Sequence, residues 1–100
     1  MEQKVNNEMK IELKEEIAKG VYSNLAILTH SSSEFVVDFA QVLPGLAKAN
    51  VQSRVILSPE HAKRLLMALQ ENIRKYESVF GPIQMPEQTT IAPLGVKGEA

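Results

Sequence analysis

The feature that most constrains the fold of this chain is a long amphipathic helix, predicted over residues 59–80. Ser58 can cap its first turn, and Pro59 suits the first helical position because its nitrogen needs no hydrogen there. Gly81 can adopt a left-handed conformation at the end, and Pro82 prevents the helix from continuing. The apolar residues recur every three or four positions in one stripe: Ala62, Leu66, Leu69, Ile73, Tyr76 and Phe80, flanked by Leu65 and Val79. Such a helix requires an apolar surface to pack against.

The segments before this helix have the two-residue period of β-strands. Strands are expected at residues 9–14, 21–29, 34–42 and 51–57. The first alternates apolar with charged residues and is expected at a sheet edge, whereas the second has apolar residues on both faces and is expected in the interior. Residues 15–20 predict a turn or short helical bend, and residues 30–33, a histidine and three serines, predict a hairpin turn. Because the connections are too short for crossover helices, the expected fold is α+β: an antiparallel three- to four-stranded meander packed on one long C-terminal helix.

A single folded domain is expected, since a chain of 100 residues has no room for a second core. Apolar residues make up 44% of it and charged residues 23%, which is typical of soluble globular proteins. We predict a flexible leader at residues 1–8 and the α+β domain at residues 9–83. Residues 84–100 are predicted to be an extended or disordered tail, because prolines and glycines interrupt any regular element there.

The expected strands place apolar side chains on both faces of the sheet. One face is expected to meet the helix: Leu25, Ile27, Phe35, Val37, Phe39, Val55 and Leu57. The reverse face then shows Tyr22, Ala26, Leu28, Val36, Ala40 and Ile56. The helix, at ~33 Å, is also longer than strands of ~23–30 Å, so its late turns could extend beyond the sheet. Uncovered apolar patches of this kind mark interaction surfaces and predict self-association as a symmetric dimer, with a peptide or another protein as the alternative partner. The candidate interface residues are Tyr22, Leu28, Val36 and Ile56 on the reverse face, or Tyr76, Val79 and Phe80 on the late helix.

No group of residues predicts catalysis, a cofactor or a metal. His30, the serines after it, Glu34 and Asp38 include the side-chain types of a nucleophilic triad, but close neighbours around a tight turn cannot easily form an oriented relay. The two histidines, His30 and His61, have no zinc-binding spacing. At the junction before the helix, Glu60 would repel a phosphate. We therefore expect neither an enzyme nor a cofactor-binding protein.

Charge and composition weigh against nucleic acid and membranes as partners. Eleven basic and twelve acidic residues give a net charge of −1. The basic residues of the helix, Lys63, Arg64, Arg74 and Lys75, are offset by Glu60, Glu71 and Glu77. The chain has no long apolar run and no apolar segment near its start, which predicts neither a membrane span nor a signal peptide. The absence of cysteine fits a reducing compartment. The expected location is the cytoplasm.

Four segments resemble a family of short bacterial and archaeal proteins classed only as a domain of unknown function. They are Gly-Val-Tyr-Ser-Asn-Leu-Ala from residue 20, Ser-Glu-Phe-Val-Val-Asp-Phe from residue 33, Leu-Ser-Pro-Glu-His-Ala-Lys-Arg-Leu-Leu from residue 57, and Glu-Asn-Ile-Arg-Lys-Tyr-Glu from residue 71. The resemblance covers about residues 9–83 and implies a strand meander followed by a helix. The order of elements is also similar to the core of bacterial secretion chaperones, which bind non-native chains on exposed apolar grooves.

These observations predict a non-enzymatic, self-associating protein-interaction module. The first alternative is a chaperone-like binder of extended or non-native peptides. The second is a weak nucleic-acid binder that uses the basic residues of the helix surface.

Overall fold

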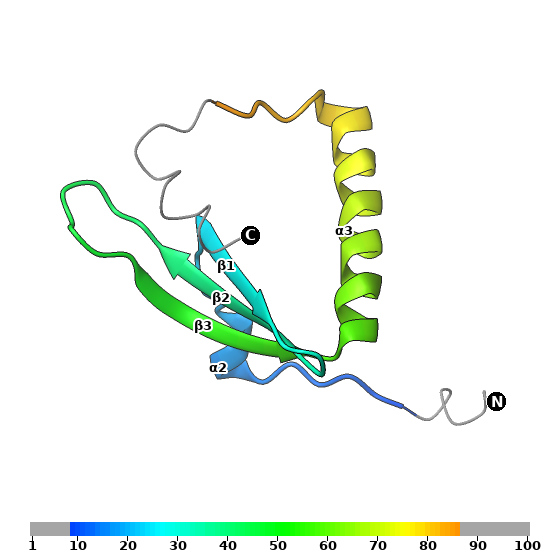
Figure 1. The fold of residues 1–100 in the computed structure, drawn as a ribbon. Helices are drawn as coiled ribbons and strands as arrows, with labels where there is room; N and C mark the ends of the chain where they lie inside the picture. The colour runs from blue at the N-terminus through cyan, green and yellow to red at the C-terminus, as the bar shows by residue number, and fades with distance from the viewer. Residues whose placement is uncertain (1–8, 87–100) are drawn as a thin grey trace.

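The computed structural model describes residues 9–86 of the chain. Its elements, in order, are α2 (Glu15–Ala18), β1 (Leu25–His30), β2 (Phe35–Gln41), β3 (Asn50–Leu57) and α3 (Pro59–Phe80) (Figure 1). The α+β class and the order of a strand meander followed by a helix are confirmed. The expected leader at residues 1–8, and residues 87–100 of the expected tail, lie outside the described residues.

The three strands form one antiparallel sheet in the order β1-β2-β3. The hairpin between β1 and β2 is formed by a serine turn, as predicted. The Ser31 amide donates to the carbonyl of Glu34 at 2.9 Å, and the Ser31 hydroxyl oxygen accepts from the amides of Ser33 and Glu34 at 3.2 and 3.3 Å. Serine favours such turns because its hydroxyl bonds to nearby backbone groups. These contacts place His30 opposite Phe35.

The edge strand expected at residues 9–14 is not formed. This segment has no regular secondary structure, and its side chains are exposed, with Ile11 at 93%. Alternation of apolar and charged residues permits a strand, but a strand forms only where a neighbour pairs with its backbone. The expected helical bend is present as the single turn α2, followed by Gly20 at φ 75°. With no strand formed by residues 9–24, β1 lies at the edge of the three-stranded sheet and not in the interior.

The register of the hairpin changes which side chains share a face. Leu28 lies opposite Val37, and His30 lies opposite Phe35. Residues directly opposite each other point to the same side of a sheet, so the even-numbered residues of β1 share a face with the odd-numbered residues of β2. The expected grouping of Leu25 and Ile27 with Val37 was therefore wrong. The physical reason is the length of the turn: four residues separate the paired ends, and the loop sets the register of a hairpin.

We call the two sides of the sheet the apolar face and the mixed face. The apolar face carries Ala26, Leu28, His30, Phe35, Val37, Phe39, Ser53, Val55 and Leu57. The mixed face carries Leu25, Ile27, Thr29, Val36, Asp38, Ala40, Val51, Arg54 and Ile56. Within residues 9–86, the buried apolar side chains are Val37 and Ala40, both from the central strand. The sheet thus has one small core position on each side.

Helix α3 begins and ends where its local signals predict. The amide of His61 donates to the hydroxyl oxygen of Ser58 at 3.1 Å, which caps the first turn. At the other end Gly81 has φ 92°, and its amide donates to the carbonyl of Glu77. The Glu77 carboxylate accepts a further bond from the amide of Ile83 at 2.9 Å. Both ends of the helix are therefore capped by residues next to it in the chain.

Replacing Ser58 with alanine is expected to reduce the free energy of unfolding by about 1 kcal/mol, because the first turn loses its side-chain acceptor. Urea unfolding followed by circular dichroism, at one fixed protein concentration, measures this change. Ser78→Ala is the matched control, since the Ser78 hydroxyl donates to the carbonyl of Lys75 inside the same helix and caps neither end. Equal losses in the two variants would contradict the capping role.

Helix α3 does not lie on the sheet of its own chain. Figure 1 shows it standing apart from the strands, and its main contact with the sheet is with the adjoining strand β3. None of its residues is buried. The expected packing of helix on sheet is not made within one chain, because Ser58 alone separates Leu57 from Pro59. Strand-to-helix connections in packed units usually have about two to six residues, and a single residue gives the helix little freedom to turn back.

Candidate interaction surfaces

The first candidate surface is the apolar side of α3, which we call the α3 stripe. It consists of Ala62, Leu66, Leu69, Ile73, Tyr76 and Phe80. Leu66 and Leu69 are each 54% exposed and Phe80 is 71% exposed, although all lie on the side that a packed helix would bury. The rings of Tyr76 and Phe80 contact each other, with centroids 4.9 Å apart and planes tilted by 42°. The stripe therefore offers a continuous apolar surface along more than four turns of helix.

The second candidate surface is the apolar face of the sheet. Val37 is buried at its centre, while Leu28 on β1 and Val55 on β3 are 47% and 38% exposed. None of the strand residues on this face is Lys, Arg, Asp or Glu. His30 at one end stacks on Phe35, with ring centroids 5.3 Å apart. The other end opens into a hollow of about 610 Å³ lined by Val21, Ser23, Asn24, Leu25, Ala26, Phe39, Ser53 and Val55. This face suits an apolar partner.

The mixed face has an ion pair at its centre. Arg54 on β3 donates to both carboxylate oxygens of Asp38 on β2, at 2.6 and 2.8 Å. This hydrogen bonding, aided by the charge of the guanidinium, lowers the pKa of Asp38 below its ordinary value. Two-point contact holds both side chains across the strand pair. A partner covering this face would have to desolvate the pair, so the mixed face is the less suitable docking surface.

The lowered pKa of Asp38 predicts a pH dependence of stability. A carboxylate whose pKa falls on folding stabilises the protein above its unfolded pKa, and this contribution is lost as pH falls through the lower folded value. Asp38→Asn is expected to reduce the free energy of unfolding at neutral pH, and the difference from wild type should shrink as the solution is made more acidic than the ordinary aspartate pKa. Unfolding curves at a series of pH values measure it. Arg54→Gln should abolish the same pH dependence, and retention of it would assign the effect to another group.

The structure separates the residues predicted for the reverse sheet face. Leu28 lies on the apolar face, whereas Val36 and Ile56 pair with each other on the mixed face. Tyr22 precedes β1 and is 67% exposed. These four residues therefore do not form one surface. The missed signal was the number of turn residues, which determines whether even-numbered residues of β1 share a face with even-numbered or odd-numbered residues of β2.

The residues predicted at the late helix do lie together. Tyr76 and Phe80 are in contact, and Val79 is beside them on the same turn of α3. Val79 and Phe80 are 72% and 71% exposed. They form the C-terminal end of the α3 stripe and its flank.

Asn24 links the start of β1 to the end of β2, a role that was not predicted from the sequence. Its side-chain amide donates to the carbonyl of Val42 at 3.0 Å, and its side-chain oxygen accepts from the amide of Val42 at 2.8 Å. Its backbone amide donates to the carbonyl of Ala40 at 3.1 Å. The side chain thus imitates a peptide group and extends the pairing beyond β1. Its place just before a strand was the available signal, since asparagine readily bonds to nearby backbone groups.

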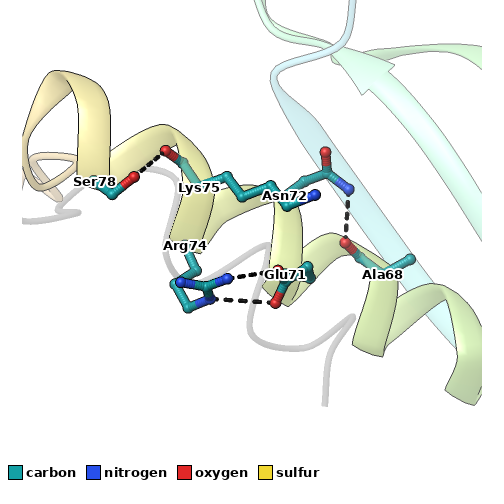
Figure 2. A network of polar contacts seen from close by, with 6 residues as sticks. All are labelled: Ala68, Glu71, Asn72, Arg74, Lys75 and Ser78. Carbon is teal, nitrogen blue, oxygen red and sulfur yellow. Dashed lines mark hydrogen bonds and ion pairs between the residues drawn. The ribbon is translucent and has the colours of Figure 1, made fainter.

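The polar side of α3 carries charges of both signs in close pairs. Arg64 contacts Glu60 at 2.6 Å, and this hydrogen bond lowers the pKa of Glu60. Arg74 contacts Glu71 at 2.6 Å, as Figure 2 shows together with the bond from Asn72 to the carbonyl of Ala68. Two of the four basic residues proposed for nucleic-acid binding are therefore engaged with carboxylates.

The residues weighed for catalysis or metal binding have structural contacts. The serines after His30 form the hairpin turn, and the backbone of His61 takes part in the helix cap. Within residues 9–86, no three side chains of the metal-ligating types come together as a binding group. Over the same residues, no helix is long and apolar enough to cross a membrane.

Comparison with known proteins identifies a family. Residues 1–85 match a family model described as "Protein of unknown function (DUF3467)". No curated protein and no solved structure matches the chain.

Proposed function

This chain belongs to the DUF3467 family, and from its surfaces we propose that it is a non-enzymatic protein-interaction module that associates with itself. The observation that carries the proposal is the exposure of the α3 stripe from Leu66 to Phe80. Complete burial of a Leu, Ile or Phe side chain contributes about 1.5–3 kcal/mol, and roughly half or more of this contribution is unrealised in a single copy for Leu66, Leu69 and Phe80. A partner that covers the α3 stripe would supply this missing burial free energy.

The stability of α3 supports the same proposal. Most of the stability of protein helices comes from the packing of an apolar side, and even favourable isolated helices are marginal in water. Here the capped ends add about 1 kcal/mol, and the exposed Glu60–Arg64 and Glu71–Arg74 pairs add little, which is a small support for 22 residues. A helix so little supported within its chain is stabilised by association.

The two alternatives use other features of the same molecule. A chaperone-like binder of extended peptides would use the apolar face and the hollow beside Asn24. A nucleic-acid binder would use the polar side of α3, where the pairing of Arg64 and Arg74 with glutamates weakens the positive field. We therefore favour self-association. A cytoplasmic location is part of the proposal and rests on the absence of cysteine.

Light scattering at a series of micromolar concentrations tests the proposal. The expected particle has twice the chain mass of 11.1 kDa and dissociates on dilution. A particle of single-chain mass at every concentration would contradict self-association. In that case, suppression of the aggregation of an unfolded client would favour the chaperone, and steeply salt-dependent retention on a polyanion column would favour nucleic acid.

A further inference from the structure

We propose that two copies of this chain exchange their helices, so that the α3 stripe of each copy covers the apolar face of the other copy's sheet. The inference rests on the proposed self-association and specifies its partner and both contact surfaces. Three choices define the arrangement. The first is which face of the sheet is covered, the second is whether the covering helix comes from the same chain or from another, and the third is whether the other chain is a second copy.

The charge of the two faces decides the first choice. The apolar face has Val37 at its centre with Leu28 and Val55 on either side, and its strand residues include no Lys, Arg, Asp or Glu. The mixed face has the Asp38–Arg54 pair at its centre. An apolar helix laid on that pair would remove it from water without offering hydrogen bonds in return, which is unfavourable. The stripe therefore docks on the apolar face.

The strand-to-helix junction decides the second choice. Leu57 ends β3 and Pro59 begins α3, with Ser58 between them committed to the helix cap. A short connection of this kind favours exchange of the element that follows it between two copies, because the element cannot reach its own chain's surface without strain. Within one chain α3 already stands away from the sheet (Figure 1).

The third choice follows from the match between the two uncovered surfaces of one chain. Each copy has one uncovered stripe and one uncovered apolar face. A three-stranded sheet measures about 10 Å between its outer strands and so accepts one helix, which is about 10 Å across. A two-fold axis pairs each stripe with the other copy's sheet and leaves neither surface uncovered. Contact between two α3 stripes would leave both sheets bare, and a peptide on the sheet would leave the stripe bare.

Cross-linking tests the arrangement directly, because the chain has no cysteine of its own. Leu28→Cys places a thiol on the apolar face, and Leu69→Cys places one at the middle of the stripe. One of the two variants carries a tag that changes its mass, and an equal mixture is treated with a short bis-maleimide. The expected product is a covalent dimer of one chain of each kind, with little product from either variant alone. Val55→Cys and Leu66→Cys repeat the test with an independent pair.

Ile56→Cys, on the mixed face, is the matched control and should give little product with Leu69→Cys. If Ile56→Cys cross-links to Leu69→Cys as well as Leu28→Cys does, the proposed docking of α3 on the apolar face is wrong. A dimer formed by Leu69→Cys alone would indicate helix-to-helix contact and overturn the exchange while leaving self-association intact. The double variant Leu28→Cys/Leu69→Cys would cross-link within one chain if the monomer were closed, which would overturn the exchange. A dimeric protein that gives no mixed product would overturn it as well. Failure of self-association itself appears separately, as single-chain mass in unreacted protein.

Discussion

Replacing Leu69 with glutamate is expected to convert the protein from a dimer to a monomer and to remove much of its helical signal. Leu69 lies at the middle of the α3 stripe and is 54% exposed in a single chain, so the substitution meets little obstacle before association. In a dimer the same position is covered, and an unpaired carboxylate there costs several kcal/mol. The dimer should therefore dissociate. Because α3 has little other support, the helix should then melt in part. Light scattering gives the mass, and far-ultraviolet circular dichroism gives the helix content.

The control for this variant is Met67→Glu. Met67 belongs to the same helix, is 61% exposed and lies away from the stripe, so it receives the same charge without entering the proposed contact. The dimer and the helical signal should survive in Met67→Glu. If both variants dissociate alike, the effect comes from the added charge on the helix. If neither dissociates, the stripe is not the contact.

Local signals in the sequence were sufficient for the helix and for the hairpin. Ser58 and Gly81 lie at the two ends of α3, where their hydroxyl and their backbone freedom were expected to act. Ser31 forms the predicted turn. In each case the residue that determines the structure acts on backbone within a few positions of itself, so no knowledge of the rest of the fold is needed.

Predictions that depended on pairing were less successful. Met9, Ile11 and Leu13 have the period of a strand, but the period does not supply a neighbour, and the segment remains unpaired. The faces of β1 were reversed relative to β2, because alternation shows which residues share a face within one strand and the turn determines how two strands match. This one error divided the predicted interface, placing Leu28 and Val36 on opposite sides.

The corrected register separates the predicted interface residues that can contact a partner helix from those that cannot. Leu28 on the apolar face and Val36 on the mixed face are neighbours across the first strand pair, yet only Leu28 lies where a partner helix is expected. The ion pair between Asp38 and Arg54 could not be predicted from spacing either, since the two residues are brought together by the register of β2 and β3. Interface and ion pair thus depend on the same property, the alignment of strands.

Lengthening the junction between β3 and α3 is expected to have the second large effect. Six glycine and serine residues inserted between Leu57 and Ser58 leave the helix cap intact and add a flexible connection that spans about 20 Å when extended. The helix can then turn back, so that its stripe covers the apolar face of its own sheet. We expect a particle of single-chain mass with its helical signal retained, in contrast to Leu69→Glu, which loses both the dimer and the helix.

The matched control inserts the same six residues between Ala47 and Lys48, in the exposed loop that joins β2 to β3. This insertion lengthens the chain equally but leaves the junction at Ser58 unchanged, and long additions to surface loops are tolerated with small losses of stability. The protein should remain a dimer. A junction variant that stays dimeric at low micromolar concentration would show that α3 is held by its partner for a reason other than the short connection. A monomeric junction variant that has lost its helix would show that the apolar face does not receive the stripe, because the surface was then within reach and was not used.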